Sequence, residues 1–165
     1  MDTLEAIRTL RSVRDFESRP VPDEIITRIL NAGRWSGSSK NTQPWQFVLI
    51  KDHNILNELS KCGDYAQHLL RANFAIALTT EVTKRAEYDG GRCSQNMMLA
   101  AWNEGVGSCI ASMHRKQQAN RVLGIPESFE LQQVISFGYP TSEYRRPPRQ
   151  GGRVPLETIL HRDRW

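Results

Sequence analysis

Two arginines and a hydroxyl lie within four residues near the start of the chain, as Arg11, Ser12 and Arg14, beside the apolar Val13 and Phe16. Planar guanidinium groups match the geometry of phosphate and carboxylate, so this segment could bind an anion. Cations are also favourable at the C-terminal end of any helix. On these residues alone, a solvent-exposed helix end is the better interpretation.

A second polar segment, residues 36–45, combines glycine and small hydroxyl side chains with Asn41 and Gln43. Small residues let a backbone approach a ligand closely, and the two amides offer donors and acceptors. A loop before a strand commonly has this composition, so an ordinary loop stays open as an alternative. In a third segment, residues 89–101, we favour a capped core helix, with Asp89 near its start and Met97 packed inside.

The sequence contains no GxGxxG, GxxxxGK[ST], HExxH or GxSxG motif. If the protein uses a nicotinamide cofactor, it does not hold it with a Rossmann fold. We expect no local metal cluster, because the four histidines stand apart in the sequence: His53, His68, His114 and His161. The cysteines are odd in number and lack CxxC spacing, which indicates free thiols in a cytoplasmic protein: Cys62, Cys93 and Cys109.

The 165 residues carry a net charge of +4, which raises the question of nucleic-acid binding. The basic residues are dispersed, apart from a group near the C-terminus: Arg145, Arg146, Arg149 and Arg153. Nucleic-acid modules usually concentrate charge on one face, and an anionic cofactor accounts for part of the excess equally well. We therefore expect no nucleic-acid partner, and no membrane partner, since no run approaches about 20 apolar residues. A nucleic-acid binder stays as an alternative, which predicts affinity that falls steeply with salt.

Apolar spacing predicts helices over residues 3–12, 23–31, 54–70, 92–103 and 115–123. Apolar runs predict strands over residues 45–50, 73–80, 106–113 and 131–137, with 73–80 in the centre. Helices and strands mix without a clean βαβ order, which favours one α+β domain over residues 1–165 rather than a doubly wound sheet. The tail, Leu156 to Trp165, is apolar without a local core, so we expect it to pack against a partner subunit.

Taken together and in order, these segments resemble the FMN-dependent nitroreductase family over essentially the whole chain. The family's Arg-Arg-Ser-x-Arg-x-Phe motif is echoed by residues 11–16, and its Pro-Ser-x-x-Asn-x-Gln-Pro-Trp loop by residues 37–45. Its long central helix is similar to residues 94–108, its late strand to 135–140 and its tail to 153–157. Each match alone is weak, but five in the right order are a strong indication.

The resemblance implies an FMN site at the interface of a homodimer. Arg11, Ser12 and Arg14 would contact the flavin, with Arg14 on the pyrimidine side of the ring. The remaining contacts would come from the other subunit's loop, from a strand against the ring and from a phosphate ligand in the tail: Gly37, Ser38, Ser39 and Asn41; Cys109, Ile110 and Ala111; and Arg153.

The resemblance also implies a mainly antiparallel central sheet flanked by helices, with the helix near residues 92–104 in the dimer core and the C-terminal tail wrapping the partner. The chain departs from the family pattern at three positions. Leu10 replaces the first motif arginine, Gly37 replaces a common proline, and Ser112 replaces an acidic residue of some members. Little chain lies between Ile50 and Asn73 to form the helical insertion of larger members.

The activity implied by the resemblance is that of an oxidoreductase with a ping-pong mechanism. NADH or NADPH would pass hydride to flavin N5, and a small acceptor such as a nitroaromatic or a quinone would then be reduced at the same face. No side-chain nucleophile is needed, since the cofactor carries the chemistry. Two alternatives stay open: a dedicated enzyme on the same scaffold (dehalogenation, azoline oxidation or flavin destruction), and a flavin-binding module without turnover.

Overall fold

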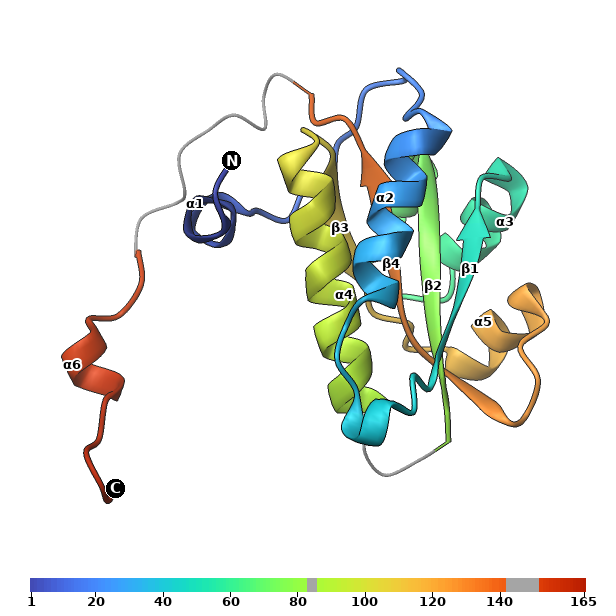
Figure 1. Ribbon diagram of the computed structural model, residues 1–165. Helices are drawn as coiled ribbons and strands as arrows, with labels where there is room; N and C mark the ends of the chain where they lie inside the picture. Colours follow the sequence, from blue (N-terminus) through green and yellow to red (C-terminus); the bar gives the residue numbers. More distant parts are fainter. Residues whose placement is uncertain (83–85, 142–151) are drawn as a thin grey trace.

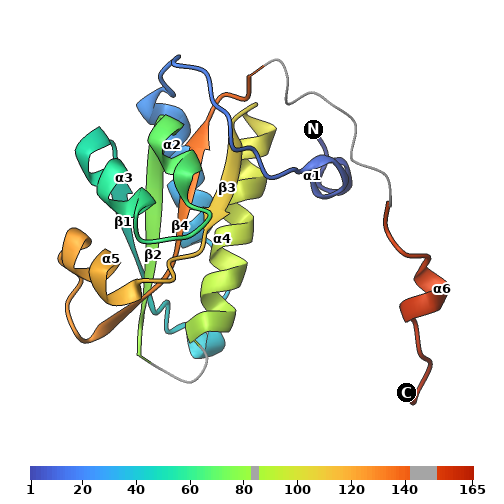
Figure 2. The same cartoon turned by 180° about the vertical axis from the view of Figure 1, so that it is seen from behind.

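The computed structural model describes residues 1–82, 86–141 and 152–165. Within them, a four-stranded sheet is formed by β1 (Trp45–Ile50), β2 (Phe74–Glu81), β3 (Gly107–Ala111) and β4 (Phe129–Gly138). The strand order is β1-β2-β4-β3, and each neighbouring pair is antiparallel. Helices cover both faces of this sheet, as Figures 1 and 2 show from opposite sides. The expected α+β fold with an antiparallel central sheet is confirmed.

Strand β2 is covered on both of its faces. Phe74, Ile76 and Leu78 join the core formed with α2 (Asp23–Arg34) and α4 (Ala86–Asn103). Ala75 and Ala77 join the opposite core, formed with α3 (His53–Ser60), the 3-10 helix η2 (Gln67–Arg71) and α5 (Lys116–Leu123). Side chains alternate between the faces of a strand, so a continuous apolar run marks a strand buried on both sides. The predicted central strand is confirmed.

The single helix predicted over residues 54–70 is wrong, because α3 ends at Ser60 and η2 begins at Gln67. Between them the chain bends against the segment that follows β3. A Cβ at Gly63 would stand 2.3 Å from the Ser112 carbonyl oxygen, and the Arg115 amide donates to the Cys62 carbonyl. Buried residues keep a spacing of three or four across the bend, which is why the pattern read as one helix.

Helix α4 begins at Ala86, earlier than the predicted start near Arg92. Gly90 and Gly91 were expected before the helix but lie inside it. Glycine inside a helix costs about 0.5–1 kcal/mol relative to alanine. Gly90 faces β2 closely, since an added Cβ would already touch the side chains of Leu78 and Thr80 at 3.5 Å.

Both ends of the chain lie outside the packed layers (Figures 1 and 2). Helix α1 (Thr3–Thr9) begins at an Asp2 cap and ends before the predicted residue 12. It rests on the last turn of α4, where the Trp102 indole donates to the Thr9 hydroxyl at 3.0 Å. Leu4, on the predicted apolar side of this helix, is 78% exposed.

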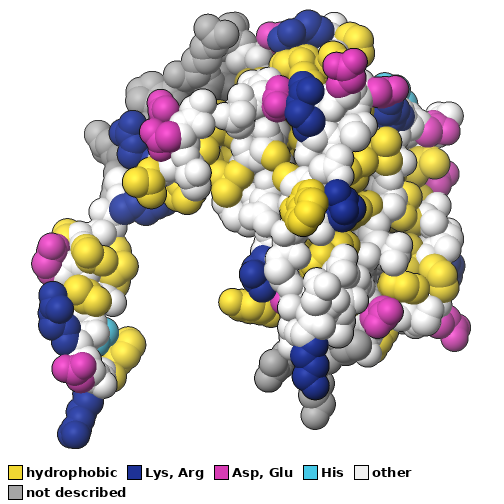
Figure 3. Space-filling view, viewed as in Figure 1, with side chains coloured by type: hydrophobic (Ala, Val, Ile, Leu, Met, Phe, Trp, Pro, Cys, Tyr) yellow, Lys and Arg dark blue, Asp and Glu magenta, His cyan; other side chains and the backbone are white. Residues whose placement is uncertain are grey.

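The tail carries a short helix, α6 (Leu156–Ile159), and its apolar side chains face solvent (Figure 3). Leu156 is 62% exposed and Trp165 fully exposed. Exposed apolar groups of this size are typical of a surface that packs against another molecule. That the tail wraps a partner subunit stays a prediction. The basic residues Arg145, Arg146 and Arg149 lie outside the described residues.

Candidate functional site

Beyond Arg11, the first candidate segment runs along the end of the sheet. Ser12 pairs with Ser108 in a parallel bridge, and the Val13 amide donates to the Ser108 carbonyl at 2.9 Å. Four residues later, the Glu17 amide donates to the Tyr139 carbonyl at 2.8 Å. The segment is therefore fixed across the ends of β3 and β4, which sets the position of the three residues between these bonds, Arg14 among them.

Two glycines make room for this segment. Gly107 and Gly138 face one another in the β3–β4 register. A Cβ on Gly107 would stand 2.6 Å from Val13 Cγ2, and a Cβ on Gly138 would stand 2.8 Å from the Phe16 ring. Larger residues would push Val13 and Phe16 away. The packing of Val13 and Phe16 against these glycines thus fixes the position of the polar residues of the motif.

We expect Gly107→Ala to lower the free energy of unfolding by about 1–3 kcal/mol, the usual cost of overpacking a core. The matched control is Gly91→Ala, because a Cβ at that exposed position of α4 meets nothing within 4 Å. Alanine favours the helix there, so the control should be neutral or slightly more stable. Urea denaturation measures both, and equal midpoints for the two variants would contradict the packing argument.

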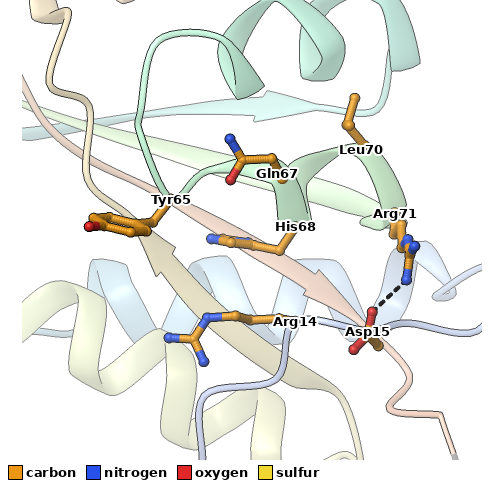
Figure 4. Close-up of a pocket in the computed structure, with 7 residues that line it drawn as sticks. All are labelled: Arg14, Asp15, Tyr65, Gln67, His68, Leu70 and Arg71. Atoms are coloured by element: carbon orange, nitrogen blue, oxygen red, sulfur yellow. Dashed lines mark hydrogen bonds and ion pairs between the residues drawn. The ribbon is translucent and has the colours of Figure 1, made fainter.

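Arg14 borders a pocket of about 440 Å³ between this segment and η2 (Figure 4). Its lining comes from both segments: Arg14, Asp15, Tyr65, Gln67, His68, Leu70 and Arg71. Asp15 and Arg71 form an ion pair of 2.7 Å there, half-exposed and so worth little in stability. Arg14 has no hydrogen-bond or ion-pair partner among the described residues, so its guanidinium is free to bind a ligand.

His68 is a buried side chain of this pocket that the sequence did not single out. Its Nδ1 lies 2.8 Å from Ser136 Oγ, and the Ser136 hydroxyl donates to the Cys109 carbonyl at 3.2 Å. With that hydroxyl proton used, Nδ1–H is the donor to Ser136, and Nε2 is left as an acceptor without a partner in the described structure. Burial first, and then the Arg14 guanidinium, lower the pKa of His68 from 6.5 to about 4, so the ring is neutral at pH 7.

The residues expected against the flavin ring lie on β3, next to Arg14. Cys109 and Ala111 are buried, whereas Ile110 is 40% exposed. Burial raises the pKa of the Cys109 thiol, while Arg14 and a hydrogen bond from Ser12 lower it. Arg14 thus lowers the pKa of both Cys109 and His68 through its charge. The thiol stays protonated near neutral pH.

Arg11 behaves as the helix-end interpretation predicts. Its Nη1 donates to the Arg8 and Leu10 carbonyls at 2.9 and 2.8 Å, just past the end of α1. These bonds satisfy carbonyls that a helix end leaves without partners. A contact between Arg11 and FMN stays a prediction, as does one by Arg153, which is exposed in the tail.

The second candidate segment is a strained loop that contains the 3-10 helix η1 (Ser39–Asn41). Lys40, Asn41 and Gln43 adopt φ angles of 52°, 57° and 48°, in the left-handed region that side chains disfavour. The Ser38 hydroxyl accepts from the Gln43 amide at 2.9 Å and closes the loop. Gly37 is exposed, and Ser38 and Ser39 are half-buried.

The two candidate segments lie at opposite ends of α4. The loop contacts the first turn of this helix, where the Ser39 amide meets Asp89. The other segment lies at the last turn, where Trp102 contacts Thr9 and β3 follows. Asp89 and Trp102 are thirteen residues apart, which at 1.5 Å per residue places them about 20 Å apart along the helix. One chain therefore does not bring both halves of the predicted site together.

The described residues contain no group of three or more His, Cys, Asp or Glu side chains arranged to hold a metal ion. Over the same ranges, no helix combines the length and the apolarity that crossing a membrane requires.

The family model of the nitroreductase family matches residues 7–86 and 64–139. The chain is 30% identical, over 99% of both sequences, to an Archaeoglobus fulgidus protein whose name pairs NADH dehydrogenase with NAD(P)H nitroreductase. It is 27% identical to the NADPH-flavin oxidoreductase of Vibrio harveyi, over 99% of this chain and 75% of that protein. This chain belongs to the nitroreductase family.

Solved structures agree with the fold. A Parabacteroides distasonis crystal structure, under the same pair of names as the Archaeoglobus protein, superposes with a TM-score of 0.91 at 26% identity, covering 99% of this chain and 98% of that one. An FMN-dependent nitroreductase of Clostridium difficile superposes with a TM-score of 0.89 at 21% identity, over 99% of this chain and all of that one. At that identity the second likeness concerns the fold alone.

Proposed function

We propose that this protein is an NAD(P)H-dependent oxidoreductase that binds FMN and reduces small acceptors such as nitroaromatics or quinones. Family membership supports the class of enzyme and the flavin. The observation that carries the proposal for this chain is the pocket lined by Arg14 and a neutral His68. Among the residues that the structure describes, the Arg14 guanidinium and His68 Nε2 have no hydrogen-bond partner. The edge of the flavin ring presents carbonyl oxygens and an N–H group. The Arg14 guanidinium could donate to the former, and His68 Nε2 could accept from the latter.

The residues proposed to bind the flavin fit FMN in chemistry. Arg14 would lie at the pyrimidine side of the ring and favour negative charge there. Cys109 and Ala111 are small, which lets a flat ring approach the β3 backbone. Arg153 would bind the phosphate, for which a guanidinium fork is well shaped. FMN would supply the transfer of hydride, so these side chains have to bind, orient and stabilise charge.

The separation of the two candidate segments along α4 supports the proposal of a homodimer. Because about 20 Å of helix lies between Asp89 and Trp102, the loop of residues 36–43 would reach the Arg14 pocket of a second copy of the chain. The exposed apolar tail offers a surface that such a copy would cover. The nicotinamide and the acceptor would occupy the same pocket in turn, which is a ping-pong scheme.

We expect the protein to bind FMN with micromolar or tighter affinity, and FAD more weakly, because a phosphate clamp leaves no room for an adenylate. Equilibrium titration followed by flavin fluorescence measures both constants. Steady-state oxidation of NADH and NADPH with a quinone or nitroaromatic acceptor then separates an enzyme from a flavin-binding module. A folded protein without measurable affinity for FMN would rule the proposal out.

A further inference from the structure

Asp89 is a buried carboxylate that does not line the Arg14 pocket. The sequence suggested a helix cap, but α4 begins at Ala86, so Asp89 lies within the first turn and is 3% exposed. Its Oδ2 accepts the Ser39 amide at 3.3 Å, and its Oδ1 lies 3.7 Å from Arg92 Nη1. A buried charge is costly unless it is paired and hydrogen-bonded. Of the two partners of Asp89, Ser39 belongs to the loop of residues 36–43 and Arg92 contacts it.

Two more residues of the same helix face contact that loop. Asn96 donates to the Ser36 hydroxyl at 2.8 Å. The Arg92 guanidinium covers Gly37 so closely that a Cβ there would be 2.7 Å from Nη2. Positions 89, 92 and 96 are spaced by three and four residues, so they share one side of α4. This side holds the loop at three successive points: Ser36, Gly37 and Ser39.

The loop needs such support because of its backbone. Three of its side-chain-bearing residues, Lys40, Asn41 and Gln43, have positive φ. Conformations of this kind persist where the surroundings over-determine them, and they cluster at binding sites. Without Asp89, the amide that begins η1 would lose its acceptor, and the turn could relax toward ordinary φ angles.

We propose that Asp89 is a positioning residue, which holds the loop of residues 36–43 in the shape required to bind the flavin of the partner subunit. Arg92 pairs with the carboxylate, and Asn96 fixes the start of the loop. This inference rests on the proposed FMN function. It adds a residue that does not touch the cofactor and acts through Ser39.

The first experiment compares Asp89→Ala with Glu87→Ala in the full-length protein. Both remove one acid from the first turn of α4, but Glu87 is exposed and contacts no part of the loop in the described structure. Loss of a hydrogen bond to a charged group predicts FMN binding weaker by about tenfold or more in Asp89→Ala. Glu87→Ala should bind as the parent does. Asp89→Asn, whose amide oxygen still accepts from Ser39, should recover most of the affinity.

Amide hydrogen exchange of the FMN-free protein gives a readout independent of the flavin. Asp89→Ala should speed exchange at Ser39–Gln43 and leave the β2 amides unchanged, whereas Glu87→Ala should alter neither. If Asp89→Ala folds, exchanges slowly in the loop and binds FMN as tightly as the parent, the proposal is overturned. If the parent itself binds no FMN, the proposed function fails, and faster loop exchange in Asp89→Ala would still identify Asp89 as the anchor.

A second pair of variants tests the same hydrogen bond from its donor side, and serves if Asp89→Ala does not fold. Ser39→Pro removes the amide proton, whereas Ser39→Ala removes the hydroxyl alone. Proline is tolerated here, since Ser39 begins η1 and Ser38 is extended at φ −132° and ψ 161°. Ser39→Pro should bind FMN about tenfold more weakly than Ser39→Ala. This difference should vanish in the Asp89→Ala background and persist in the Asp89→Asn background, where the amide oxygen still accepts from Ser39. Equal affinities of the two Ser39 variants in the parent background would overturn the proposal.

Discussion

Removal of residues 153–165 should convert the protein from a dimer into a monomer that no longer binds FMN. The tail buries none of its apolar side chains against its own chain, so we expect it to act through contact with a second copy. Burying apolar surface is worth about 25 cal/mol per Å², and the side chains of Leu156, Ile159, Leu160 and Trp165 together offer several kcal/mol. Sedimentation equilibrium should give twice 18.9 kDa for the parent and 18.9 kDa for the truncated chain.

Two controls separate the apolar contacts from the charge of the tail. Arg153→Met keeps the apolar residues, so it should stay dimeric while FMN binding weakens. Glu157→Gln changes an exposed tail residue and should affect neither property. A truncated protein that sediments as a dimer and still binds FMN would show that the interface lies elsewhere.

The sequence pattern was sufficient where burial imposes a simple periodicity. The run from Phe74 to Thr80 identified the central strand, because both faces of β2 are covered and its side chains are apolar up to Leu78, followed by two buried threonines. Periodicity failed at Gly63, where a close contact with Ser112 bends the chain. That contact joins residues 49 positions apart, and no local window of sequence contains it.

For the candidate site, too, the sequence identified some residues and missed others. Arg14 could be proposed from its neighbours in a short motif, and the paired glycines Gly107 and Gly138 explain how that motif is seated. His68 was missed because its hydrogen-bond partner, Ser136, lies 68 residues away. Asp89 was misinterpreted as a helix cap because its partner, Ser39, lies 50 residues away. Roles of this kind depend on which strands and helices become neighbours.

Arg14→Met should lower the midpoint potential of the bound flavin by about 30–65 mV. A cation beside the pyrimidine side of the ring stabilises the negative charge that reduction brings, and it does less for the neutral oxidised form. A charge-assisted hydrogen bond is worth about 1.5–3 kcal/mol, and about 1.4 kcal/mol corresponds to 30 mV for a two-electron couple. Methionine keeps much of the apolar stem of the side chain. Affinity for oxidised FMN should therefore fall less than affinity for reduced FMN.

The same variant has a readout without any flavin. Burial and Arg14 together lower the pKa of His68 to about 4, so removing the guanidinium should raise that pKa toward its ordinary value, as measured by NMR titration of the ring. Arg153→Met provides the opposite pattern: weaker FMN binding through the phosphate, with an unchanged potential and an unchanged His68. Spectroelectrochemistry that gives one potential for the parent and for Arg14→Met would exclude Arg14 from the ring. A raised pKa of His68 in that case would place Arg14 in the pocket but away from the reduced pyrimidine.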